Sequence, residues 1–221
     1  MHRRGIVLLV PLALLLTAAG GRAVTRHSES AEQYVKAAAK ALGSARSVRI
    51  SGSISTSGVE HVDLVLFASG DLAGNVTVDG EVMQVRVVNG TDYFQAPAAY
   101  WEKVSKLPTA TAKKLARYWV STPNSGSSGF GTSLDIKPLA AQLGAAPGLS
   151  IVGHETVDGR AAVGVKSSRG DVLWIATSGT PYPIEEVEPG SGGGSLTFSG
   201  WNSFVLPTPP KQAVALSSFG S

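Results

Sequence analysis

A run of short alternating segments between Glu60 and Gln95 constrains the fold of this chain more than any other feature. Apolar residues recur there at every second position, as at Val62 and Leu64, which is the period of a half-buried β-strand. Asp79-Gly80 and Asn89-Gly90 interrupt the alternation, and both dipeptides are typical of two-residue hairpin turns. The run therefore predicts an antiparallel meander with one apolar face, which another layer has to cover.

Further strands are predicted on both sides of this run. One spans Ser47 to Ser55, where Val48 and Ile50 alternate with polar residues. The later strands are expected at Leu149–Thr156, Ala161–Lys166, Val172–Ala176, Ile184–Glu188 and Leu196–Phe198.

Three segments favour helices. The first, Ser28–Leu42, carries an apolar stripe and begins with Ser28 or Ser30 as its cap. Lys106–Val120 is predicted to form one or two short helices, and Leu134–Leu143 another. The order of helix, strands, helices and strands predicts an α+β protein with one large antiparallel sheet.

The two ends of the chain and one internal stretch are expected to lie outside this sheet. Residues 1–23 combine a basic start, an apolar run over Ile6–Leu16 and small residues before Ala23, which is typical of a signal peptide. The mature domain is then 24–221, and an extracytoplasmic location is expected. A loop is predicted over Asn124–Gly131, and a Pro-rich tail from about residue 205.

Charge gives no reason to expect a nucleic-acid partner. The chain has 19 basic and 16 acidic residues, and three of the basic ones precede residue 24. Without them the mature domain is neutral, whereas nucleic-acid-binding domains are usually basic.

One segment is nevertheless basic. Five cations and a single acidic residue lie between residues 102 and 117. Such a helix could contact anionic lipid headgroups. The alternative, which we favour, is a solvated helix with Trp101 and Trp119 packed inward. The five cations are Lys103, Lys106, Lys113, Lys114 and Arg117.

No catalytic signature is present in the sequence. It contains no G-x-S-x-G elbow, no phosphate-binding GxxxxGK[ST] loop and no GxGxxG opening a helix. Glu185, Glu186 and Glu188 could serve as acid and base, but they are interpreted as solvated strand-edge charges. The chain has no cysteine, and its four histidines are too far apart for a paired metal motif. We expect neither an enzyme nor a metal or cofactor site.

Three stretches carry a resemblance to a known family: SVRISGSI with GDLAGNVTVDGEVMQVRVVNGTDYFQ, then GHETVDGRAAVGVKSSRGDVLWIATSGTPYPIE, then FSGWNSFVLPTPP. Together they resemble exported actinobacterial, mycobacterial-like lipoproteins of the LppX/LprG type, within the LolA/LolB-like lipoprotein-carrier superfamily. The resemblance covers about Ser28 to Pro210. The chain departs from the family at Gly21, where a lipid-anchor cysteine would be expected, so no lipid anchor is predicted there.

The resemblance implies a strongly curved antiparallel β half-barrel wrapped over a few helices, with lipids or acyl chains carried between sheet and helices. The strand faces of this chain are rich in valine and alanine, so we expect space to remain inside such a curved sheet. Each candidate lining residue could instead be ordinary core. The candidates are Val48, Ile50, Leu64, Leu66, Val76, Val78, Val85, Val87, Val163, Val165 and Phe198.

Three functions follow from this sequence, in decreasing order of support. The first is a noncatalytic carrier or sensor that encloses a lipid or another apolar ligand. The second is a cargo-free interaction or regulatory module of the cell envelope with the same fold. The third is a hydrolase whose site would bring His61 or His154 together with a serine and an aspartate.

Overall fold

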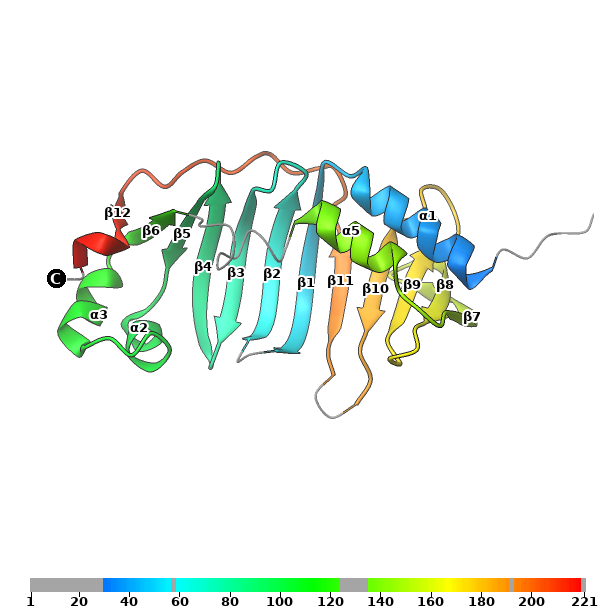
Figure 1. Ribbon diagram of the computed structural model, residues 1–221, viewed down its shortest axis with the longest axis horizontal. Coiled ribbons are helices and arrows are strands. Elements are labelled where there is room, and N and C mark those ends of the chain that lie inside the picture. The colour runs from blue at the N-terminus through cyan, green and yellow to red at the C-terminus, as the bar shows by residue number, and fades with distance from the viewer. Residues whose placement is uncertain (1–29, 57–58, 124–134, 191–192, 220–221) are drawn as a thin grey trace, which may run out of the picture.

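The computed structural model describes residues 30–56, 59–123, 135–190 and 193–219. The predicted signal peptide and the predicted loop 124–131 lie outside these ranges. The described residues form a curved, open sheet of twelve strands with four α-helices and a short 3-10 helix, η1 (Leu216–Phe219). The predicted α+β class with one large, curved sheet is confirmed (Figure 1).

The elements fall into two meanders, each with its own helices. The first comprises α1 (Ala31–Gly43), β1 (Ser47–Thr56), β2 (Val59–Phe67), β3 (Leu72–Val78), β4 (Glu81–Val88), β5 (Thr91–Gln95), α2 (Ala98–Lys103), α3 (Thr109–Leu115) and β6 (Trp119–Pro123). The second comprises α5 (Ile136–Gly144), β7 (Ser150–Val157), β8 (Arg160–Lys166), β9 (Val172–Ala176), β10 (Pro183–Val187), β11 (Ser195–Ser199) and the terminal β12 (Ala213–Ala215).

A long-range pairing at the centre of the sheet joins the two meanders. The strand order is β12-β6-β5-β4-β3-β2-β1-β11-β10-β9-β8-β7, so β1 and β11 are neighbours at the centre of the sheet. They run antiparallel, with Ile50 opposite Phe198 and Gly52 opposite Leu196. Both meanders therefore contribute to one continuous concave face.

The hairpin turns form where the sequence predicts them. Asp79 and Gly80 have φ angles of 48° and 78°, and Asn89 and Gly90 have 50° and 72°. Positive φ at both central residues matches the right-handed twist of the flanking strands. The turns fix the register of β3 to β5, which places Val76, Val85 and their alternate neighbours on the buried face.

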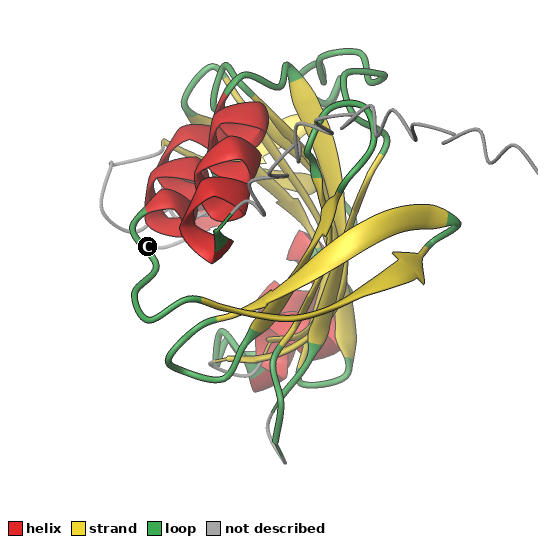
Figure 2. Ribbon diagram, turned by 90° about the vertical axis from the view of Figure 1, so that its right-hand side faces the viewer, coloured by secondary structure: helices red, strands yellow, loops and turns green. Residues whose placement is uncertain are grey.

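Helices α1 and α5 pack against each other on the concave side of the sheet (Figures 1 and 2). Ser30 caps α1 through a capping box with Gln33, which decides between the two predicted caps. The helices are antiparallel and close: a Cβ on Gly43 would lie 3.3 Å from that of Ala140, and one on Gly144 would lie 3.4 Å from that of Ala39. The small residues let the helix pair sit as one compact layer.

The prediction for Lys106–Val120 is wrong at its end. Helix α3 ends at Leu115, and Trp119 and Val120 belong to β6, which pairs with β5 so that Val120 lies opposite Phe94. Trp119, Val120 and Thr122 are aromatic or β-branched, which favours a strand, and backbone pairing with β5 outweighs the helical pattern before it. Trp101 is buried as expected, whereas Trp119 is half-buried beneath the Arg86 guanidinium, 4.8 Å from its ring centroid.

The tail adds a strand that the sequence did not predict. After β11 it crosses the ends of the first meander's strands (Figure 1), where Arg86 donates a hydrogen bond to the Thr208 carbonyl at 3.1 Å. It ends as β12, which pairs in parallel with β6, with Val214 opposite Val120. The tail therefore covers the outer edge of β6.

Two strand glycines are required by close backbone approach. A Cβ on Gly74 in β3 would clash with the Asp63 carbonyl of β2, and a Cβ on Gly52 would clash with the Ser195 carbonyl of β11. Glycine inside a strand is typical of such close contacts and of tight bends in a sheet.

We predict that Gly74→Ala lowers the free energy of unfolding by about 2–4 kcal/mol, because β2 or β3 has to move. Gly153→Ala in β7 is the matched control, since a Cβ there would meet nothing within 4 Å. It should change stability by less than about 0.5 kcal/mol. Urea denaturation monitored by tryptophan fluorescence measures both, and equal effects would contradict this account.

Candidate functional site

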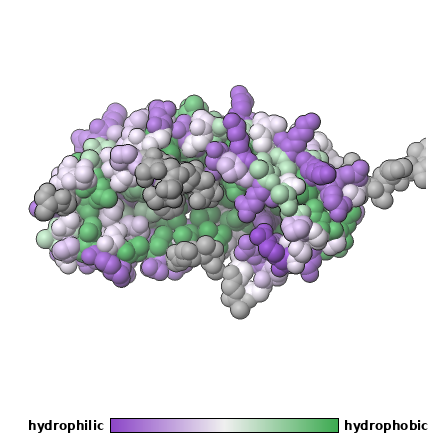
Figure 3. Space-filling model, viewed as in Figure 1, coloured by the Kyte–Doolittle hydropathy of each residue, from purple (hydrophilic) through white to green (hydrophobic). Residues whose placement is uncertain are grey.

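A cavity of about 340 Å³ lies between the concave face of the sheet and helices α1 and α5. It persists because the helix pair covers the face without filling the curve beneath it. In the space-filling view from this side, apolar side chains gather over the strands of the first meander, and hydrophilic ones lie along the rims and over the region of α1 and α5 (Figure 3). Cavities of this size are within the range of small-molecule sites.

The walls of the cavity are apolar and come from both meanders. The helices supply Val35, Leu42, Leu139 and Leu143, with Ala146 and Leu149 following α5. The strands supply Ile50, Ile54, Val62, Leu64, Leu66, Val165, Leu173, Pro183, Leu196 and Phe198. Such walls gain from contact with an apolar ligand and offer it no competing hydrogen bonds.

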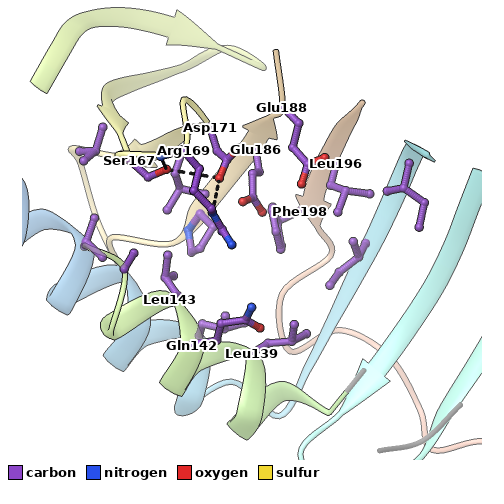
Figure 4. A pocket seen from close by; sticks show the side chains of 18 of the residues that line it. Leu139, Gln142, Leu143, Ser167, Arg169, Asp171, Glu186, Glu188, Leu196 and Phe198 are labelled. Atoms are coloured by element: carbon purple, nitrogen blue, oxygen red, sulfur yellow. Dashed lines mark hydrogen bonds and ion pairs between the residues drawn. The ribbon is translucent and has the colours of Figure 1, made fainter. Parts of the chain in front are cut away.

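One end of the cavity is polar (Figure 4). Arg169, in the β8–β9 turn, donates from Nε to Asp171 Oδ2 at 3.1 Å, and the Ser167 hydroxyl lies 3.3 Å from the same oxygen. Glu186 from β10 and Glu188 just beyond it also line this end, whereas Gln142 lies across the cavity on α5, beside Leu139. Two carboxylates therefore face the cavity beside an Arg–Asp pair.

The Glu186 carboxyl is the most perturbed group of the site. Its partial burial raises its pKa, and the nearby carboxylates of Asp171 and Glu188 raise it further, while Arg169 acts in the opposite direction. Desolvation and like charges both disfavour the ionised form. The folded protein thus holds this negative charge in an unfavourable environment.

The eleven residues predicted to line a ligand site divide into two groups. Ile50, Leu64, Leu66, Val165 and Phe198 line the cavity. The other six are buried core residues that are not among its lining: Val48, Val76, Val78, Val85, Val87 and Val163. The curved sheet brings the first group together because β1, β2, β8 and β11 lie beneath the helix pair.

Sequence reasoning missed the helix wall and the polar end. Leu139 and Leu143 are one turn apart on α5, and this i, i+4 spacing was the available signal. In the sequence, Arg169 lies in the turn Ser168-Arg169-Gly170 between two predicted strands, and Glu186 was interpreted as a solvated strand charge. Whether Glu186 faces the concave side depends on the pairing of β10 with β11, and local sequence does not specify that pairing.

Both described histidines lie away from this cavity. His61 on β2 and His154 on β7 are exposed, and neither is among the residues that line it. In the described ranges no three His, Asp or Glu side chains are grouped to hold a metal ion. Within the same ranges, every helix is too short or too polar to cross a membrane.

The five predicted surface cations lie on and around α2 and α3, at the far end of the sheet from α1 (Figure 1). All five are exposed. Lys103 forms an ion pair with Glu81, with its Nζ 2.8 Å from Glu81 Oε1. Lys106, Lys113, Lys114 and Arg117 form no ion pair with a described residue and present their charge to solvent.

Comparison with known proteins shows the fold and leaves the family open. No protein-family model matches the chain, and no curated protein matches it. Among solved structures, LprF from Mycobacterium bovis is similar at a TM-score of 0.60 and 20% identity, over 81% of this chain and 96% of LprF. The Mycobacterium tuberculosis lipoprotein LppX is similar at 0.55 and 19%, over 79% and 96%. The fold implied by the sequence resemblance is confirmed.

We predict that Glu186→Gln raises the free energy of unfolding by about 1 kcal/mol at pH 7.5, a figure reduced by partial solvent exposure. Because the folded-state pKa is raised, the ionised carboxylate costs stability above that pKa, and the cost disappears as pH falls below the unfolded value. The gain should therefore vanish near pH 4.

Urea denaturation at both pH values measures this difference. Glu155→Gln, at an exposed position on β7, is the control and should leave stability nearly unchanged. A gain for Glu186→Gln that is the same at pH 4 as at pH 7.5 would contradict the electrostatic explanation.

Proposed function

We propose that this protein is a noncatalytic, extracytoplasmic carrier or sensor that encloses an apolar ligand between its curved sheet and helices α1 and α5. The observation that carries the proposal is the cavity of about 340 Å³ with predominantly apolar walls. Natural cores are packed with few voids larger than a water molecule, so an unfilled apolar space of this size suggests a place for a ligand.

In this proposal the apolar walls supply the driving force for binding. Each Å² of apolar surface removed from water contributes about 25 cal/mol. Leu64, Leu66 and Val165 are almost fully buried already, so the floor of the cavity is preformed. A preformed floor lowers the ordering cost of binding.

Two further observations are compatible with a carrier of the cell envelope. LppX, with which this chain shares its fold, is described as a lipoprotein. The pattern over residues 1–23 suggests export. The chain contains no cysteine, so the proposal involves no cysteine-linked lipid.

A cargo-free interaction module is the second candidate, and one surface feature favours it. Phe204, Val205 and Leu206 are consecutive apolar residues with exposed fractions of 37%, 90% and 56%. Exposed apolar patches often mark protein contacts. This candidate differs from a carrier in one measurable respect, since it does not require the internal cavity to bind anything.

We predict that purified protein binds the neutral dye N-phenyl-1-naphthylamine and that Leu139→Trp weakens this binding by about tenfold or more. Leu139 lines the cavity from α5, so the larger indole would occupy the space that the dye needs (Figure 4). Dye fluorescence titration measures the affinity, and thermal unfolding checks that the variant is folded.

Leu216→Trp is the matched control, because Leu216 lies in η1 and is 37% exposed. It should bind the dye like the unaltered protein. Organic extraction followed by mass spectrometry should also recover an apolar molecule from freshly purified protein. Absence of dye binding, or dye binding that Leu139→Trp leaves intact, would favour the interaction module.

We further propose that the cations around α3 provide peripheral contact with anionic membranes. Replacing Lys113 and Lys114 by glutamate should weaken cosedimentation with phosphatidylglycerol vesicles by about tenfold or more, since each basic residue near the surface contributes about 1 kcal/mol. Lys36→Glu with Lys40→Glu on α1 is a control with the same change in charge. Equal losses in both variants would indicate a general charge effect.

A further inference from the structure

The charged residues of the cavity all lie at one end, and their position would determine how an amphiphilic ligand is oriented. Its charged side chains are confined to the end formed by the β8–β9 turn and the residues at the end of β10 (Figure 4). The opposite walls, from α1, α5, β1 and β2, are leucine, isoleucine and valine apart from the uncharged Gln142. A molecule with one apolar and one polar end would be bound in a single orientation, with its polar end beside these charges.

The charges at this end do not cancel. Arg169 is the one cation among the described residues that line the cavity, and its Nε–H donates to Asp171. The Ser167 hydroxyl lies 3.3 Å from the same carboxylate, so Asp171 is well satisfied. The Glu186 and Glu188 side chains make no hydrogen bond or ion pair with any described residue. Among the described residues, neither carboxylate at this end has a partner: Glu186 is half-buried and Glu188 is exposed.

The surroundings of Glu186 indicate which charge on a ligand would be bound favourably beside it. Its pKa is raised by burial and by Asp171 and Glu188, so the protein itself stabilises the carboxylate poorly. A cation placed beside it would supply the missing partner, and an anion would add a third repulsion. A neutral hydroxyl could donate a hydrogen bond but would leave the negative charge uncompensated.

We infer that this cavity selects amphiphiles whose polar end is cationic, such as an alkylammonium, over those with a neutral or anionic polar end. Apolar walls hold the chain, and Glu186 and Glu188 hold the cation. The inference rests on the proposed carrier function, because it names the ligand class of the same site.

Three ligands with the same ten-carbon chain test this inference: decylammonium, decanol and decanoate. Each displaces N-phenyl-1-naphthylamine from the protein below its critical micelle concentration at pH 7.5, and the concentration for half displacement is compared. Decylammonium should act at a concentration about tenfold or more below that of decanoate, with decanol between them. In Glu186→Gln/Glu188→Gln, the difference between decylammonium and decanol should fall to within about twofold.

Two variants separate the causes. Glu155→Gln/Asp158→Asn removes the same charge from the exposed β7–β8 hairpin and should preserve the ranking. Leu139→Trp should weaken all three ligands together, because it acts on the shared apolar chain. Similar potency of the three ligands, or preference for decanoate, would overturn the charge selectivity while leaving the carrier intact. Failure of all three to displace the dye would overturn the carrier proposal and this inference with it.

Discussion

The pairing of β1 with β11 is the interaction on which the rest of the structure depends. It joins segments about 150 residues apart in the chain through five opposed residue pairs, from Arg49–Ser199 to Ser53–Ser195. Without it, two separate meanders would each need their own cover. With it, Ile50 and Phe198 become neighbours on one floor beneath one pair of helices. Gly52 permits the approach, because any side chain there would meet the backbone of β11.

The geometry of the helix layer follows from the same constraint. Helices α1 and α5 contact each other through Gly43, Ala140 and Gly144, so their layer is narrow. A narrow layer over a wide curved face buries that face only in part. The remaining space is enclosed above by Leu139 and Leu143 and below by strands of both meanders. The cavity is therefore a consequence of how the sheet is assembled, and no single element encloses it.

Local sequence predicts the first meander well, because its turns and its strand pairings involve residues that are close together in the chain. Asp79-Gly80 and Asn89-Gly90 determine the turns, and alternation then decides which face is buried. The strands β6 and β12 were missed because their stability comes from pairing with distant residues. Valine alternation identified buried positions, but it could not separate Val165 in the cavity wall from Val163 in solid core. That distinction depends on where the helices lie above the sheet.

The polar end of the cavity is the part least visible in sequence, and it is also the part that folding alone does not favour. Turn residues such as Ser167 and Asp171 satisfy one another, as turn residues commonly do. Glu186 differs from them: its raised pKa means that its ionisation at neutral pH lowers the stability of the folded protein. A ligand that binds only the folded state raises the free energy of unfolding, and the increase grows with the logarithm of the ligand concentration divided by its dissociation constant. A cationic ligand beside Glu186 would raise the free energy of unfolding more than an uncharged one, because its charge would also compensate that of the carboxylate. In the proposed carrier, the half-buried Glu186 would therefore link the stability of the fold to the charge of the ligand.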